Sequence, residues 1–204
     1  MSCLCTPRIR KQIAKADGDP DGLIVTATPG SDRTSYGLAE GVQRDADVFL
    51  ARAREGSDAL ADHQYRLASD VLADALAMWG RVSRYDHFLA EVADCSFALQ
   101  LRTRLWGARR DAVVDKATAD IALGLYRWAA ADLPGLATEF PDDSEITRLL
   151  AIALYSGGKS VEAADVCKDA AANARALGMD DQPFLDLHRS ILNRTLSVGG
   201  LMPV

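Results

Sequence analysis

The residues that could hold a metal ion or act as nucleophiles are few and widely spaced. Cys3 and Cys5 form a Cys-x-Cys pair, but a structural zinc site would need a second pair of cysteines or histidines. No such pair follows, because the remaining candidates lie far apart in the sequence: Cys95, Cys167, His63, His87 and His188. We therefore expect no metal site, and we expect reduced thiols rather than a disulfide framework.

The run Gly157-Gly158-Lys159-Ser160 ends like a phosphate-binding loop. Such a loop also needs an earlier glycine at a fixed spacing and a strand leading into it, and this sequence has neither. A turn between two helices explains the same four residues. Because no nucleophile–base pair or pair of carboxylates emerges elsewhere, we expect no catalytic residue, no cofactor and no enzymatic activity.

A cluster of charges could form a docking patch for an anion or a partner. It consists of Arg109, Arg110, Asp111, Asp115 and Lys116, all within one long predicted helix. Charges of alternating sign at this spacing are typical of a solvated helix face. We therefore interpret this cluster as solvated surface.

Composition favours a soluble, folded protein. The chain has 204 residues, 49% of them hydrophobic, which suffices for one main core with at most a small appendage. Its formal charge of −6 divides unevenly, since residues 1–44 carry +1 and residues 45–204 carry −7. This acidic balance excludes a nucleic-acid coat protein. No run approaches the length of about 18 apolar residues that spans a membrane, and no signal-peptide core is present, so we expect a cytoplasmic protein.

The first 44 residues predict a short basic helix followed by a β-hairpin. Pro7–Ala16 places Ile9 and Ile13 four apart on one helical face, and a run of Asp, Gly and Pro ends the helix. Two β-leaning runs follow, Leu23–Thr28 and Ser35–Ala39, with a turn between them. Basic side chains of this segment could contact DNA phosphates weakly and without reading sequence. They are Arg8, Arg10, Lys11, Lys15 and Arg33.

From Asp45 onward the strand signal disappears, and apolar residues recur with a helical period. We predict helices over about Asp45–Arg54, Ser57–Gly80, Asp94–Leu123, Ser144–Ser156, Ser160–Leu177 and Gln182–Leu196. Another helix begins near Tyr126, and Pro134 should kink or break it. Asp142, three residues before Glu145, is expected to cap the helix that follows. The predicted fold class is therefore mainly α.

An internal repeat of thirty-four residues is the most informative feature of the sequence. Small residues recur at this spacing: Gly124, Ala129 and Ala130 match Gly158, Ala163 and Ala164. This is the period of tetratricopeptide repeats, in which glycine permits a sharp turn between antiparallel helices and alanine permits their close approach. Tyr126 and Pro141 stand where that motif has an aromatic residue and a helix-ending proline. We predict a tetratricopeptide-like array of helical hairpins, closed by the last helix.

Several short motifs follow one another between Asp45 and Leu196. They are Asp45, Asp47 and Phe49; Ala75-Leu-Ala-Met-Trp79; Ala122-Leu-Gly124; Ala153-Leu-Tyr155 with Gly158; Leu177-Gly178; and Leu187-His188 with Ile191-Leu192. In this order and spacing they resemble the bacterial transcriptional activation domain of the Streptomyces antibiotic regulatory protein family. The resemblance implies that residues 45–198 form that domain.

Residues 1–44 resemble the end of an OmpR-type winged helix, which precedes the activation domain in that family. Arg8–Ile13 resembles the end of the recognition helix, and Asp19–Thr26 with Tyr36–Leu38 resembles the wing hairpin. The family's first strands and first two helices have no counterpart here. A recognition helix needs other helices to hold it in the major groove, so we expect residues 1–44 to be a partial winged-helix remnant.

The resemblance implies a transcription regulator that acts through protein–protein contacts rather than through chemistry. Its expected partner is the transcription machinery or a second copy of the domain, which would form a homodimer. We do not expect specific DNA binding by this chain alone, nor a membrane partner. One alternative stays open, namely an autonomous tetratricopeptide-like scaffold that binds a peptide or another ligand and has no role in transcription.

Overall fold

The computed structural model describes residues 24–27, 35–38, 40, 44–80, 96–140 and 143–196. Seven α-helices and one two-stranded sheet lie within these ranges. Backbone contacts divide the chain into two units, residues 1–44 and residues 45–204. None of the helices in the described ranges is long and apolar enough to cross a membrane.

The first unit contains an antiparallel hairpin. Strand β1 (Ile24–Ala27) pairs with strand β2 (Ser35–Leu38), with Ile24 opposite Leu38. Strand β1 is rich in β-branched residues, which favour a pleated surface, and β2 contains the aromatic Tyr36. The two predicted strands are confirmed, whereas the predicted basic helix, its four basic side chains and Arg33 lie outside the described residues.

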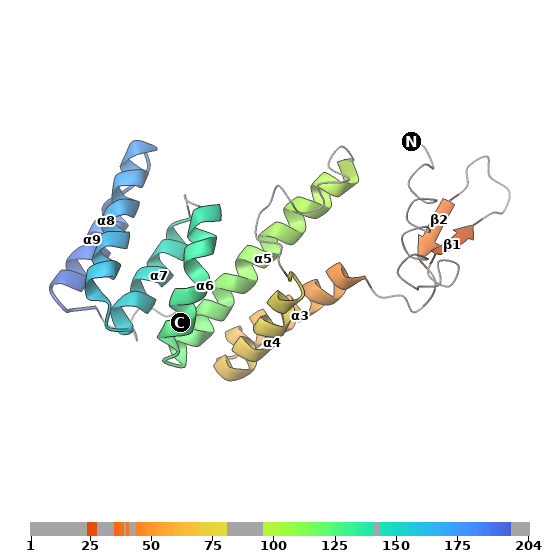
Figure 1. Ribbon diagram of the computed structural model, residues 1–204, viewed down its shortest axis with the longest axis horizontal. Coiled ribbons are helices and arrows are strands. Elements are labelled where there is room, and N and C mark those ends of the chain that lie inside the picture. The colour runs from red at the N-terminus through yellow and green to blue at the C-terminus, as the bar shows by residue number, and fades with distance from the viewer. Residues whose placement is uncertain are drawn as a thin grey trace. The chain divides into compact units, whose positions relative to one another are not determined.

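The second unit is a stack of helical hairpins, shown in Figure 1. Its helices are α3 (Asp45–Ala61), α4 (Tyr65–Ala77), α5 (Ser96–Ala122), α6 (Tyr126–Glu139), α7 (Ser144–Ser156), α8 (Ser160–Ala176) and α9 (Gln182–Leu192). Each helix packs against the next, and α3, α5, α7 and α9 also contact one another in that order. The helices α4, α6 and α8 form a second layer that packs mainly on the first. The predicted mainly α, tetratricopeptide-like fold is confirmed.

Left-handed residues end the helices at regular places. Gly124, Gly158 and Gly178 have φ angles of 76°, 84° and 72°. At Gly158, the backbone N–H donates to the carbonyl of Tyr155 (3.0 Å), and the N–H of Lys159 donates to the carbonyl of Leu154 (2.8 Å). The corresponding bonds recur at Gly124 and Gly178. This pair of hydrogen bonds satisfies the last carbonyls of a helix and needs a positive φ, which glycine adopts without strain.

The predicted break between Arg54 and Ser57 is wrong. Helix α3 continues through Gly56 to Ala61, and the chain turns at His63, whose φ is 58°. Gly56 allows α3 and α4 to pack closely, since a Cβ atom at this position would lie 2.4 Å from Cγ of Leu72 on α4. The turn at His63 was missed because a non-glycine residue with positive φ gives no clear signal in the sequence.

Two further predictions about helix ends need correction. Pro134 does not end α6, which continues to Glu139 because the buried Leu133 and Leu136 hold it on the core. The cap of α7 is Asp143 rather than Asp142. Its carboxylate accepts hydrogen bonds from the backbone N–H of Glu145 (3.0 Å) and of Ile146 (3.3 Å).

Two apolar clusters meet along α5. The larger one joins α5 to α9 and contains fully buried side chains such as Ile121, Leu133 and Ile152. The smaller one joins α3, α4 and α5, around Phe49 and Leu72. The long helix α5 therefore contributes to both clusters and connects the two ends of the stack.

Candidate protein-binding site

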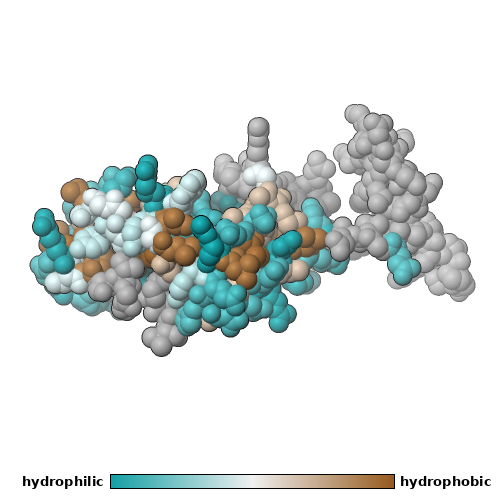
Figure 2. Space-filling view, turned by 90° about the horizontal axis from the view of Figure 1, so that it is seen from below, coloured by the Kyte–Doolittle hydropathy of each residue, from teal (hydrophilic) through white to brown (hydrophobic). Residues whose placement is uncertain are grey.

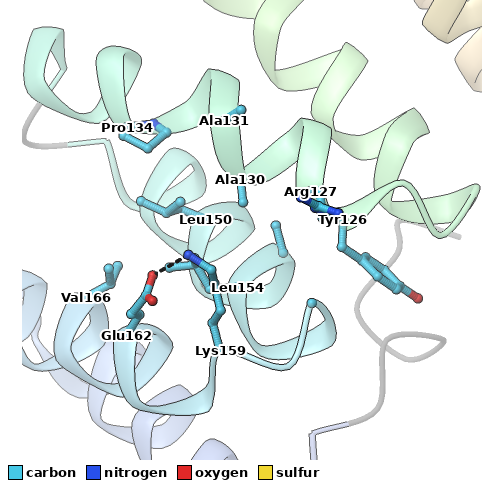
Figure 3. A pocket seen from close by; sticks show the side chains of 12 residues that line it. Tyr126, Arg127, Ala130, Ala131, Pro134, Leu150, Leu154, Lys159, Glu162 and Val166 are labelled. Carbon is cyan, nitrogen blue, oxygen red and sulfur yellow. Dashed lines mark hydrogen bonds and ion pairs between the residues drawn. The ribbon is translucent and has the colours of Figure 1, made fainter.

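A hollow of about 850 Å³ opens between α6 and α8, with α7 beneath it. Figure 3 shows Ala131 and Pro134 on α6, Glu162 and Val166 on α8, and Leu150 of α7 between them. The floor is buried, while most of the rim residues are exposed to solvent. The hollow is thus a groove with an apolar floor and an open mouth.

Helical periodicity places these side chains on one face. On α6, Arg127, Ala130, Ala131 and Pro134 stand at positions i, i+3, i+4 and i+7, which share a face of the helix. The small alanines leave space that a larger side chain would fill. Because α6 and α8 are the second helices of the two repeats, the hollow lies between equivalent elements of neighbouring hairpins.

Three charged side chains line the hollow. The ammonium Nζ of Lys159 lies 2.9 Å from Oε2 of Glu162, so these two charges compensate each other. The guanidinium of Arg127 has no hydrogen-bond or ion-pair partner among the described residues. The hollow therefore carries one uncompensated positive charge, near the start of α6.

The neighbouring pair of second-layer helices, α4 and α6, is joined by a buried polar network. Its centre is Asp120 on α5, which is 1% exposed. The hydroxyl of Ser69 on α4 donates to Asp120 (2.6 Å), and Nζ of Lys116 lies 2.8 Å from Asp120 and 2.9 Å from Asp132 on α6. Burial alone would lower the pKa of Lys116, but its hydrogen bonds to the two carboxylates outweigh burial and raise it.

Arg109 and Arg110, two of the arginines of α5, tie this helix to its neighbours in the stack. Arg110 donates to Asp143 (2.7 Å) and Glu145 (2.8 Å) at the start of α7. Burial alone would lower the pKa of Arg110, but its hydrogen bonds to Asp111, Glu145 and Asp143 outweigh burial and raise the pKa above its ordinary value. The guanidinium therefore stays charged. The interpretation of this cluster as solvated surface is therefore wrong for its arginines, whose partners Glu139 and Asp143 lie thirty and thirty-three residues away along the chain.

Arg109 makes the second of these ties. Its guanidinium donates to Glu139 (2.7 Å) at the end of α6 and lies 4.9 Å from the ring centroid of Trp106. A cation over an indole ring adds a favourable electrostatic contact. Together with Arg110, it holds α5 against both α6 and α7.

Two other titratable side chains, the half-buried Asp115 and the buried Cys167, have no cation bonded to them among the described residues. Burial raises the pKa of Asp115, although a hydrogen bond from the Ser57 hydroxyl opposes the rise. Burial also raises the pKa of the Cys167 thiol to about 11, which keeps it protonated and unreactive. Within the described ranges, no group of three or more His, Cys, Asp or Glu side chains could hold a metal ion.

Comparison with known proteins identifies the fold family. The sequence profile described as "Bacterial transcriptional activator domain" matches residues 44–192, which include all seven helices from α3 to α9. The chain belongs to the bacterial transcriptional activator domain family. A search of curated proteins finds no match.

A solved structure, "Mycobacterium tuberculosis EmbR in complex with low affinity phosphopeptide", is similar to the bacterial transcriptional activator domain of this chain and to the unit before it. The TM-score is 0.69 with 27% sequence identity, and the match covers 97% of this chain and 50% of that chain. This chain therefore spans about half the length of the EmbR chain. The predicted resemblance to a family of transcription regulators is confirmed.

The predicted repeat residues occupy distinct places in the activator domain. Gly124 and Gly158 lie in the turns, and Ala129 and Ala163 are fully buried. Tyr126 is half-buried and lines the hollow, whereas Pro141 lies outside the described residues. Sequence reasoning missed the other lining side chains, because the hollow results from the spacing of α6 and α8 rather than from a residue motif.

Proposed function

We propose that the activator domain of this chain is the protein-interaction module of a transcription regulator and carries out no catalysis. Its partner is the transcription machinery or a second copy of the domain. The observation that supports this proposal best is the open hollow between α6 and α8. Helical hairpin arrays bind extended or helical partners on such surfaces.

Exposed apolar side chains elsewhere on the domain favour a protein partner. Val161 at the start of α8 is 75% exposed, and Trp128 on α6 is 66% exposed. Figure 2 shows hydrophobic side chains at several places on one largely hydrophilic face. Aromatic and aliphatic residues of this kind contribute most when a partner covers them, at about 25 cal/mol per Å² of apolar surface.

For residues 1–44 we propose a partial winged helix that contacts DNA only through phosphates. The basic side chains that would make these contacts are Arg8, Arg10, Lys11, Lys15 and Arg33. Such contacts are sequence-independent and weaken steeply with salt. Titration of promoter and random DNA at increasing salt tests this proposal, because equal affinities for the two DNAs are expected at every salt concentration.

Direct binding to polymerase tests the main proposal. The purified chain, and a shortened chain beginning at Asp45, would be immobilised and exposed to mycobacterial RNA polymerase holoenzyme at roughly 0.15 M salt. We expect both chains to bind polymerase or, in analytical ultracentrifugation, to associate with themselves. Failure of both interactions in both chains would contradict the proposal and favour a peptide- or ligand-binding scaffold with no role in transcription.

A further inference from the structure

The hollow between α6 and α8 has features that narrow down its occupant. Its volume falls within the range of roughly 300–1,000 Å³ seen for ligand pockets. Small-molecule pockets bury most of their ligand, but Ala131, Pro134 and Glu162 on the walls of this hollow are themselves exposed. An occupant would therefore bury one side only, as a segment of a larger partner does.

The spacing of the walls indicates a helical segment. Arg127 and Pro134 are seven residues apart on α6, which corresponds to about 10.5 Å or two helical turns. Leu150 and Leu154 are one turn apart on the floor. A helix lying along this floor would bring apolar side chains at i and i+4 over the two leucines, because that spacing also corresponds to one turn.

The charges of the hollow determine the polar part of the occupant. Lys159 is compensated by Glu162, so Arg127 supplies the one unmatched charge among the lining residues described. A guanidinium pairs best with a carboxylate, which it can hold through two parallel hydrogen bonds. On the opposite helix, the exposed Asp165 and Asp169 lie one residue before and three residues after Val166, so a second acidic residue at that end would be repelled.

We infer that the α6–α8 hollow binds a helix of a protein partner that presents two apolar residues one turn apart and one carboxylate a turn beyond them, opposite Arg127. This inference rests on the proposed function and specifies the chemistry of its partner. The carboxylate meets Arg127 at the start of α6, and the apolar pair covers Leu150 and Leu154. A uniformly acidic helix fits less well because of the aspartates on α8.

Three fluorescein-labelled peptides of about four helical turns provide the test. Each contains two leucines four residues apart, and the position one helical turn beyond this pair carries Glu, Gln or Lys. Binding to the full chain is followed by fluorescence anisotropy and by the methyl NMR signals of Ala131, Leu150 and Val166. We expect the Glu peptide to bind about three- to tenfold more tightly than the Gln peptide, and the Lys peptide to bind most weakly.

Two variants locate the contact. Arg127→Glu should reverse the order of the Glu and Lys peptides, whereas the matched control Arg66→Glu, on the exposed surface of α4, should keep it. Ala131→Phe should weaken binding of all three peptides by filling the hollow, whereas Ala172→Phe on an exposed part of α8 should not. All four positions are exposed, so the fold should tolerate these changes, and circular dichroism of each variant checks this.

The inference is overturned if no peptide shifts the methyl signals of the hollow, or if Arg127→Glu leaves the order of the peptides unchanged. The same variants tested against RNA polymerase separate this result from the broader proposal. Polymerase binding or self-association that survives both Arg127→Glu and Ala131→Phe would reject the hollow as the contact while leaving the proposed function intact. Loss of these interactions in Arg127→Glu but not in Arg66→Glu would support the inference.

Discussion

The two gaps between second-layer helices are built in opposite ways. Between α4 and α6, Lys116 lies between Asp120 and Asp132, and Ser69 completes a polar network that links the two helices through α5. Between α6 and α8, no ion pair among the described residues joins the two helices, and the space remains as a hollow over Leu150. The polar contacts that link neighbouring second-layer helices therefore lie in one gap, while the other gap is open to a partner.

The largest expected effect comes from breaking the filled gap. Lys116→Met should lower the free energy of unfolding by roughly 3 kcal/mol, because Asp120 would stay buried and lose its cation. Urea denaturation at neutral pH measures this loss. Adding Asp120→Asn should restore part of the stability, since an uncharged amide no longer needs the cation. A loss below about 1 kcal/mol for Lys116→Met would show that the network is not what holds this gap together.

A somewhat smaller effect is expected where α3 and α4 touch. Gly56→Ala should cost roughly 2 kcal/mol, because the new Cβ would collide with the fully buried Leu72. Gly135 on α6 is the matched control, since a Cβ there meets nothing within 4 Å. Gly135→Ala should instead stabilise the chain by about 0.5–1 kcal/mol through its higher helix propensity. Thermal unfolding measures both variants. A change in stability of the same sign in Gly56→Ala and Gly135→Ala would contradict this contrast.

Filling the open gap should leave stability almost unchanged. Ala131→Phe is expected to shift the free energy of unfolding by no more than about 0.5 kcal/mol, because Ala131 is exposed and the fold does not use the space beside it. Chemical denaturation next to the wild-type chain measures the difference. A large destabilisation would mean that the hollow is needed by the fold and is not simply a binding surface.

The smallest effect concerns Asp115, which lies one residue before Lys116 on α5 but accepts a hydrogen bond from a hydroxyl instead of from a cation. Its pKa is raised in the folded state, so the folded chain binds this proton more tightly than the unfolded chain does. Stability from this group therefore increases as the pH falls from neutral towards the ordinary Asp pKa of about 3.9. Asp115→Asn should remove this part of the pH dependence, as measured by thermal unfolding between neutral and mildly acidic pH. An identical pH profile in the variant would contradict the assignment.

Local features of the fold could be predicted from the sequence, whereas contacts between distant residues could not. The bounds of α7 and the turns at Gly124 and Gly158 follow from apolar periodicity and from glycine, both of which act within a few residues. The role of Gly56 depends on Leu72, and the ion pairs of Arg109 with Glu139 and of Arg110 with Asp143 join residues thirty or more positions apart. Such pairings become visible only after the helices have been stacked. The hollow belongs to the same class, because it is defined by the distance between α6 and α8.

Pro134 gives one wall of the hollow a particular dynamic character. Proline has no backbone N–H, so the carbonyl of Ala130, which lies beside the hollow, lacks the donor that an ordinary residue four positions later would supply. With one hydrogen bond fewer, the second half of α6 should open more readily than α8, and its amides should exchange with solvent sooner. A wall that yields in this way can adjust to side chains of different sizes. The same module would then tolerate substitutions in the segment it binds and keep its preference for charge more strictly than its preference for shape.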